Sequence, residues 1–227
     1  MKRLLPALFI LILLLMPLAH ASSIKDVAWI KQKGYVKYSY TLSSQYGNFS
    51  GIYIFEYKSY KSVDGKYNIT IDEKFYLEGY GRDNETETYT RDYNNKARVA
   101  VNDLPFFDQQ RYDKAVDELK QANPSISFSE EETTYKVGDK TFEAIKLYGE
   151  NSTDKITIIL GKYIGVILYV YDEDKSNGSI SEAKATDTNL KEEKGIAGGS
   201  STLRIIVAIV AIIIIALAIY FLMMKKQ

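Results

Sequence analysis

The sequence contains no cysteine, and this absence removes a whole group of chemistries. Without a thiol there is no cysteine nucleophile and no thiolate metal site. Histidine is almost as scarce, since the only one is His20, in an N-terminal segment that we expect to be removed. The mature chain then has no histidine, which excludes Ser-His-Asp and Cys-His catalysis and zinc binding through imidazole.

An excess of positive charge is also missing. Residues 22–203 hold all 29 Asp and Glu but only 24 of the 29 Lys and Arg. A nucleic-acid-binding domain needs a basic face, so we expect no nucleic-acid partner. No run of basic residues approaches the membrane as a sensor of lipid charge.

Motifs for cofactors and metals are absent or degraded. There is no glycine-rich phosphate loop. Residues 172–178, DEDKSNG, resemble the start of a calcium-binding loop, but the glycine falls one place late and Ala183 stands where that loop needs glutamate. We interpret this stretch as a solvated hairpin tip, and we predict no metal, no cofactor and no catalytic residue. Paired carboxylates for glycoside hydrolysis remain an alternative, because any two of the 29 acidic residues could approach each other in the fold.

Two apolar segments frame the chain. Residues 1–21 combine a basic start, an apolar run and the small-x-small pattern of Ala19, His20 and Ala21, which predicts a cleaved secretory signal. An uncleaved signal anchor is the alternative. Residues 205–224 form a run of twenty residues without a charge, which as a helix would cross about 30 Å of hydrocarbon.

These segments predict the topology of the chain. Lys225 and Lys226 should face the cytoplasm, because positive charge favours the inner side. The predicted protein is therefore a single-pass protein of the cell membrane with its N-terminal domain outside. Its parts are a signal peptide (1–21), an extracytoplasmic β-rich domain (22–189), a flexible stalk (190–203), a transmembrane helix (204–224) and a cytoplasmic tail (225–227).

The outer domain has the alternating pattern of β-strands. The clearest case is 67–77, where Ile69 and Ile71 should face a core and Asn68 and Thr70 should face outward. Further strands are expected at 34–42, 51–60, 84–93, 133–137, 141–148, 154–160, 163–171 and 179–188, with a short apolar piece at 97–101. We expect 163–171, apolar on both faces, to be a central strand.

One amphipathic helix is expected at 108–122, with Asp108 as its N-cap and Asn123-Pro124 as its stop. The predicted fold is therefore mainly β with some α. It is a curved antiparallel sheet, or half-barrel, with one amphipathic helix packed on its concave side.

Residues 161–189, GKYIGVILYVYDEDKSNGSISEAKATDTN, and 137–150, VGDKTFEAIKLYGE, carry a family resemblance. Their succession of turn, apolar strand and Asn-Gly turn resembles the open half-barrel of bacterial lipoprotein carriers and related periplasmic lipid-handling domains. The resemblance implies a curved sheet that binds lipid. This chain departs from the carriers by its own predicted span, which argues against a soluble shuttle.

Five Asn-x-Ser/Thr sequons are candidate glycosylation sites: Asn48, Asn68, Asn84, Asn151 and Asn177. Tyrosine is the other abundant feature, with 19 residues, all but Tyr220 in the outer domain. These tyrosines either form an aromatic platform for sugars or lipid, or simply reflect sheet propensity and cross-strand pairing. Tyr with Ile, Lys and Glu would also suit a single-span surface protein of a heat-loving archaeon.

The sequence thus favours a membrane-anchored, non-enzymatic surface protein that binds lipid or an envelope component through its sheet. A structural or adhesion module, with an envelope protein or glycan as partner, is the first alternative. A carboxylate-based glycoside hydrolase is the second. The sequence does not indicate an oligomeric state.

Overall fold

The computed structural model describes residues 24–64, 66–78, 81–91 and 105–193, and for Leu77 and strand β4 the backbone alone. Nine strands of these residues form one sheet in the order β4-β3-β2-β1-β9-β8-β7-β6-β5. They are β1 (Tyr35–Ser44), β2 (Gly47–Val63), β3 (Lys66–Leu77), β4 (Gly81–Arg91), β5 (Phe128–Val137), β6 (Lys140–Glu150), β7 (Asp154–Gly161), β8 (Val166–Asp174) and β9 (Ser179–Thr188). Every neighbouring pair is antiparallel, as the sequence predicted.

Within the described residues, four helical elements accompany the sheet: η1 (Ile24–Asp26), α2 (Ala28–Lys31), η2 (Gln109–Arg111) and α3 (Tyr112–Ala122). The predicted helix is η2 and α3 together. Asp108 caps its start, because its carboxylate accepts a hydrogen bond from the Gln110 amide at 3.0 Å. Helix α2 was not predicted, since four residues are too few to show a helical period.

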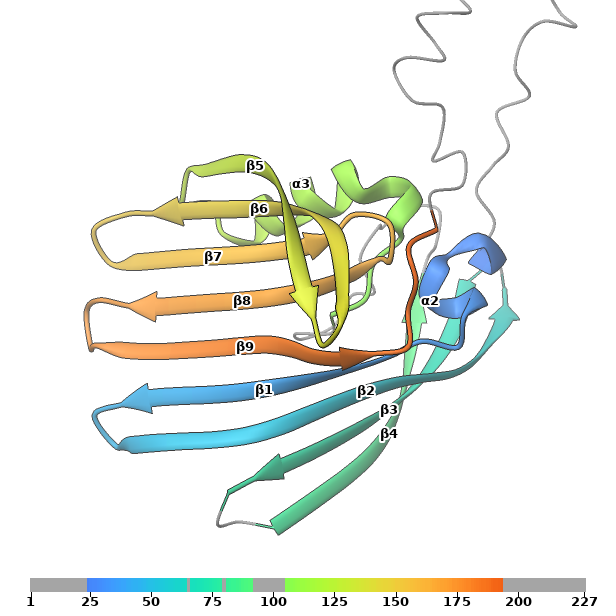
Figure 1. Ribbon diagram of the computed structural model, residues 1–227, viewed down its shortest axis with the longest axis horizontal. Coiled ribbons are helices and arrows are strands. Elements are labelled where there is room, and N and C mark those ends of the chain that lie inside the picture. Colours follow the sequence, from blue (N-terminus) through green and yellow to red (C-terminus); the bar gives the residue numbers. More distant parts are fainter. Residues whose placement is uncertain (1–23, 65, 79–80, 92–104, 194–227) are drawn as a thin grey trace, which may run out of the picture.

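Both helices lie on the concave side of the sheet, which Figure 1 shows curling around them. We call this side the inner face. Helix α3 buries Ala115, Val116 and Leu119 against strand residues on this face, chiefly Ile145, Leu147, Ile156, Ile158 and Leu160 of β6 and β7. The predicted packing of one helix on the concave side is therefore confirmed, with α2 as a second, unexpected helix.

Trp29 of α2 is the centre of the other part of the core. Its ring stacks on Phe106 with centroids 4.7 Å apart and meets the edge of Tyr57 at 5.6 Å. Its indole Nε1 donates a hydrogen bond to the Phe107 carbonyl at 2.7 Å. Gln109 continues the link, because its Oε1 accepts from the Ala28 amide at 2.9 Å. The first described helix is thereby attached to a segment more than 70 residues away along the chain.

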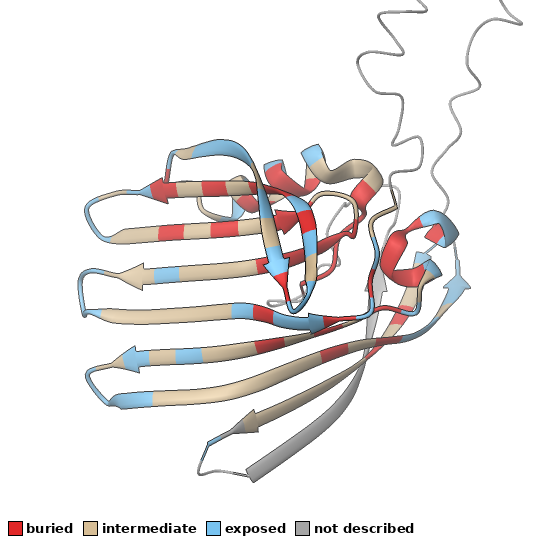
Figure 2. Ribbon diagram, in the orientation of Figure 1, coloured by how far each residue is buried: buried red, intermediate tan, exposed pale blue. Residues whose placement is uncertain are grey.

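Strand β3 has the alternation that its sequence predicts. Ile69 and Ile71 are 1% and 0% exposed, whereas Asn68 and Thr70 are half-buried on the other side. Strand β7 follows the same rule, and Figure 2 shows buried positions alternating with half-buried ones along it.

The strand expected at 163–171 begins later, at Val166. Residues 162–165 instead form the turn between β7 and β8, because Gly165 adopts a left-handed φ of +67°. A side chain at Gly165 would also meet the Phe107 carbonyl oxygen, 2.5 Å from the position of its Cβ. The expected central position of this strand holds, since β8 lies between β7 and β9.

The packed domain continues past the boundary at 189–190 that the sequence suggested. Leu190 is fully buried, and Glu193 pairs with Lys31 of α2 at 2.8 Å. Ile24 and Glu193, the two ends of the described domain, therefore lie at the same end of the sheet, while the turns β1–β2, β6–β7 and β8–β9 lie at the opposite end (Figure 1). We call this opposite end the tip end.

The predicted signal peptide (1–21), the transmembrane helix (204–224) and the apolar piece 97–101 lie outside the described residues. Among the residues that the structure describes, no helix is both long and apolar enough to cross a membrane.

Candidate functional site

A row of aromatic side chains follows the inner face across β1, β2 and β3. Tyr53 stacks on Phe75 with ring centroids 4.1 Å apart and lies parallel to Phe55 at 5.9 Å. Tyr40 and Tyr38 meet the rings of Tyr53 and Phe55 edge-on, at 5.7 and 6.0 Å. We call these five side chains the aromatic row.

Strand register explains why these rings meet. Tyr53 lies opposite Tyr38 in β1 and opposite Phe75 in β3, so all three project from the same face. Gly51 lies opposite Tyr40, and a Cβ there would come within 3.2 Å of the Phe75 ring. The lack of a side chain at Gly51 therefore leaves space for Phe75 against the sheet.

The aromatic row runs from the core toward the tip end, and its burial falls along the way. Tyr38 and Phe55 are 4% and 8% exposed, and they belong to the same cluster as Trp29. Tyr40, Tyr53 and Phe75 are half-buried. One end of the row is thus closed by the Trp29 cluster, while the rings nearer the tips have part of their surface accessible to solvent.

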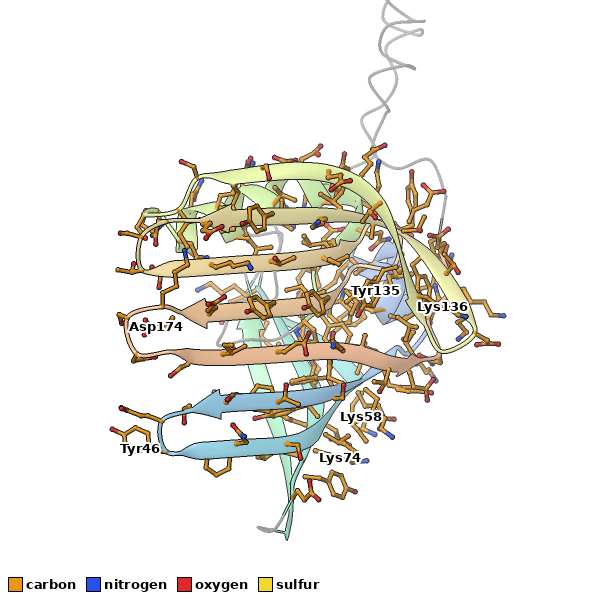
Figure 3. All side chains as sticks on the ribbon, turned by 60° about the vertical axis from the view of Figure 1, so that its left-hand side comes forward. Tyr46, Lys58, Lys74, Tyr135, Lys136 and Asp174 are labelled. Atoms are coloured by element: carbon orange, nitrogen blue, oxygen red, sulfur yellow. The ribbon has the colours of Figure 1, made fainter. Side chains whose placement is uncertain are left out.

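The charged side chains of this region lie mainly on the other face of the sheet. Lys58 pairs with Glu56 at 2.8 Å and with Asp72 at 2.9 Å, and Lys74 approaches Glu56 at 3.9 Å. Figure 3 labels Lys58 and Lys74 on these strands. On the inner face, Glu73 is the charged residue of β3 that the register places opposite Phe55. The aromatic row is therefore apolar, with tyrosine hydroxyls and Glu73 as its polar groups.

Burial also governs the acidity of the inner tyrosines. Burial raises the pKa of Tyr57 to about 12, and it raises the pKa of the fully enclosed Tyr38 well above its usual range. The Tyr38 hydroxyl donates a hydrogen bond to the Ile167 carbonyl of β8. These phenols therefore stay neutral at physiological pH, and both side chains belong to the core cluster around Trp29.

The interpretation of 172–178 as a hairpin tip is confirmed, since residues 175–178 form the turn between β8 and β9. The Asp174 carboxylate is engaged within this turn, where it accepts hydrogen bonds from the Ser176 amide at 2.9 Å and from Asn177 Nδ2 at 2.7 Å. The Ser176 hydroxyl also donates to this carboxylate and is the largest cause of the lowered pKa of Asp174. The hydrogen bonds from the Ser176 amide and from Asn177 lower this pKa further. No group of three or more acidic side chains in the described part of the chain has the geometry to hold a metal ion.

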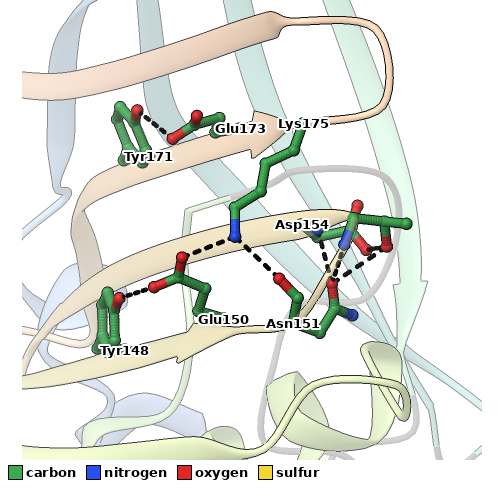
Figure 4. Close-up of polar contacts among 8 residues, drawn as sticks. Tyr148, Glu150, Asn151, Asp154, Tyr171, Glu173 and Lys175 are labelled. Atoms are coloured by element: carbon green, nitrogen blue, oxygen red, sulfur yellow. Dashed lines mark hydrogen bonds and ion pairs between the residues drawn. The ribbon is translucent and has the colours of Figure 1, made fainter.

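A second polar cluster joins the β6–β7 and β8–β9 tips. Lys175 donates hydrogen bonds to Glu150 Oε1 at 2.6 Å and to the Asn151 carbonyl at 2.8 Å, and Tyr148 donates to the same Glu150 (Figure 4). The hydrogen bond from Lys175 lowers the pKa of Glu150. This cluster ties the two tips together, and its ion pair is exposed, so it contributes little to stability.

The candidate glycosylation sites occupy different environments. Asn48 is exposed beside the β1–β2 turn, Asn177 is exposed in the β8–β9 turn, and Asn151 is half-buried in the β6–β7 turn. Asn68 is half-buried within β3, between β2 and β4. Asn84 lies in β4 opposite Lys74.

The aromatic row is only partly evident in the sequence. The number of tyrosines suggested a platform, but strand propensity explained it equally well. The signal that could have found the row is the alternation of Tyr38, Tyr40, Tyr53 and Phe55 in two neighbouring strands joined by a short turn.

Comparison with known proteins does not identify the chain. No family model and no curated protein matches it. Among solved structures, a protein from Bacteroides fragilis described as exported, with a YmcC-like fold, matches with a TM-score of 0.37 and 7% identity, over 69% of this chain and 95% of that one. MucB matches with a TM-score of 0.38 and 7% identity over 77% of this chain, which spans 60% of MucB.

An outer membrane lipoprotein-sorting protein domain from Vibrio parahaemolyticus also matches, with a TM-score of 0.20 and 9% identity, over 72% of this chain and 88% of that one. Such scores are too low to assign a family, a ligand or a partner. The archaeal origin that the composition suggested finds no support in these comparisons.

Proposed function

We propose that this protein is a membrane-anchored, outward-facing and non-enzymatic surface protein that binds the apolar chain of a lipid along the aromatic row. The observation that carries the proposal is the row itself, because half-buried rings on a concave face continue directly into the core. Such rings give an apolar chain a large contact area at little cost in conformational entropy.

The polarity of the row favours a lipid chain over a peptide. A bound peptide must satisfy its backbone N–H and C=O groups, which requires many hydrogen-bonding partners. The described polar groups at the row are tyrosine hydroxyls and Glu73, which lies opposite Phe55, and the Tyr38 hydroxyl already donates to Ile167. An acyl or isoprenoid chain needs no such partners, and burying it releases about 0.8 kcal/mol per CH₂.

The predicted anchor would keep the domain near the membrane, which is a source of lipid. The ten residues of 194–203, fully extended, span at most about 35 Å. A span at 204–224 would therefore hold Glu193, and the packed domain with it, close to the membrane surface. This anchor also makes the protein a resident of the membrane, in contrast to a soluble carrier.

The lipid proposal predicts a co-purified ligand. The outer domain, residues 22–203, contains every residue of both core clusters, so we expect it to be secreted as a folded protein when the span is removed. Organic extraction of this gel-filtered domain, followed by mass spectrometry, should yield about one lipid per protein. A folded domain that is empty, and that retains an envelope protein or glycan on a column, would favour the structural or adhesion module instead.

The anchor is tested separately. The full chain should remain with membranes after alkaline carbonate washing, and a chain that ends at 203 should appear in the medium. Protease added outside intact cells should digest the full-length protein. A full chain that is protected from this protease, or that is washed off the membrane, would show that the proposed localisation is wrong.

A further inference from the structure

We infer that Asn48, Asn151 and Asn177 are N-glycosylated and Asn68 is not, so that sugars cover the tip end of the domain. This inference goes beyond lipid binding and does not depend on it. Its basis is that the sheet gathers at one end three sequons that are far apart in the sequence, each at a hairpin turn.

Sheet topology explains the gathering. Because neighbouring strands are antiparallel, the turns β1–β2, β6–β7 and β8–β9 all lie at the end opposite Ile24 and Glu193. Figure 3 labels Tyr46 and Asp174, which stand beside two of these turns. With the proposed anchor beyond Glu193, this end of the domain would be the one farther from the membrane.

The three acceptor asparagines lie in or beside these turns, where Asn48 and Asn177 are exposed and Asn151 is half-buried. The Asn48 Oδ1 accepts from the Ser43 hydroxyl at 2.7 Å, a bond that does not use the Asn48 amide nitrogen. Asn177 is exposed, and its Nδ2 donates a hydrogen bond to the Asp174 carboxylate at 2.7 Å within the same turn. Solvated turns of this kind are the segments that a modifying enzyme can bind without unfolding a sheet.

In the Asn151 turn, the hydroxyl of Thr153, the third residue of the sequon, also bonds to the asparagine. Asn151 Oδ1 accepts hydrogen bonds from the Thr153 amide at 2.8 Å, the Thr153 hydroxyl at 3.1 Å and the Asp154 amide at 2.6 Å. This Asx-turn brings the two residues that define the sequon into contact. The Asn151 amide nitrogen has only a long contact, 3.4 Å, to the Ser125 carbonyl.

Asn68 differs from these three residues in its place in the sheet. It is half-buried within β3, opposite Lys61 in β2 and Thr90 in β4, and hydrogen-bonded strands flank it on both sides. An enzyme that must draw the backbone around its acceptor asparagine into its own site could do so at Asn68 only by opening the sheet. Asn68 is therefore the internal control for the inference.

The reaction is a transfer from an isoprenoid-linked oligosaccharide phosphate or diphosphate, catalysed by a cellular oligosaccharide transferase. The asparagine Nδ2 forms a bond to C1 of the first sugar, and the bond from C1 to the phosphate oxygen breaks. The isoprenoid phosphate or diphosphate leaves with the bonding electrons, and Nδ2 gives up one proton to a base of the transferase. No oxidant or reductant is required.

The test is site-by-site glycopeptide mass spectrometry of the full-length protein purified from the membranes of its source organism. We expect glycans at Asn48, Asn151 and Asn177 and an unmodified Asn68. Absence of glycans from all three tips would overturn the inference. Equal occupancy of Asn68 would also overturn it, because the folded structure would then play no part in the selection.

Variants of Thr153 test whether the glycan at Asn151 depends on its sequon. Thr153→Ala, expressed in the same organism, should abolish the glycan at Asn151 while Asn48 and Asn177 keep theirs. Thr153→Ser retains both hydroxyl and sequon and should keep the glycan, as should Ser152→Ala at the unconstrained middle position. A glycan that persists in Thr153→Ala, or that is lost in Ser152→Ala, would contradict sequon-directed modification of this tip.

Discussion

Ile71→Asp is expected to leave the outer domain unable to fold at physiological temperature. Ile71 is 0% exposed on the inner face of β3, in the same cluster as Trp29 and Val36. The substitution removes a buried aliphatic side chain and places a carboxyl group where it must either remain unpaired or take up a proton, at a cost of at least about 4 kcal/mol. Small domains have only about 5–15 kcal/mol of total stability. Thermal melts followed by circular dichroism measure the loss.

The neighbouring Thr70 provides the matched control. Thr70 is half-buried on the opposite face, so Thr70→Asp should change the free energy of unfolding by no more than about 0.5 kcal/mol. Both substitutions introduce the same group into the same strand, and only the face differs. An equal loss of stability at the two positions would mean that β3 does not have one buried face.

Trp29→Ala is expected to have the second large effect. The substitution removes a ring that is 2% exposed and that contacts both Phe106 and Tyr57, which costs about 3–5 kcal/mol. It also leaves the Phe107 carbonyl without the indole N–H, which adds about 1–3 kcal/mol. The expected result is a drop in melting temperature of tens of degrees, or no soluble protein, as measured by circular dichroism.

Trp29→Phe separates these two contributions. Phenylalanine retains most of the ring packing and lacks the N–H donor, so it should cost clearly less than alanine. Tyr46→Ala, at a position that is 85% exposed, should be close to neutral and serves as a control for aromatic truncation in general. If Trp29→Ala also proved close to neutral, the attachment of α2 to residues 106–109 would not stabilise the domain.

The strands were predictable because one face of each is buried, and a period of two then appears in the sequence, as at Ile69 and Ile71. Helix α3 was predictable for the same reason, with a period of 3.6. Helix α2 was not, because Trp29 owes its position to contacts with Phe106 and Phe107, which no local pattern reveals. The late start of β8 depends on the left-handed Gly165, which the sequence shows only as another glycine.

Of the candidate site, only the abundance of tyrosine could be predicted from the sequence. Many tyrosines in strands are compatible with ordinary cross-strand pairing, and Tyr38 and Tyr57 do belong to the core. The continuation of Tyr53 and Phe75 from this core toward the tip end depends on the pairing of three strands, which must be known before the rings can be placed together. The gathering of three sequons at one end likewise follows from topology and not from local sequence.

Quenching of the single tryptophan by a brominated lipid chain tests whether a lipid occupies the aromatic row. Trp29 lies in the same cluster as Phe55, at the closed end of the row, so it reports on a chain that enters from the tips. A fatty acid with bromine at its terminal carbons should quench Trp29 emission in the outer domain saturably, and the unbrominated acid should not. Phe75→Asp should abolish this quenching, whereas Tyr76→Asp, one residue away on the opposite face, should preserve it. Absence of quenching in the unaltered domain, or equal quenching in the two variants, would contradict binding along the row.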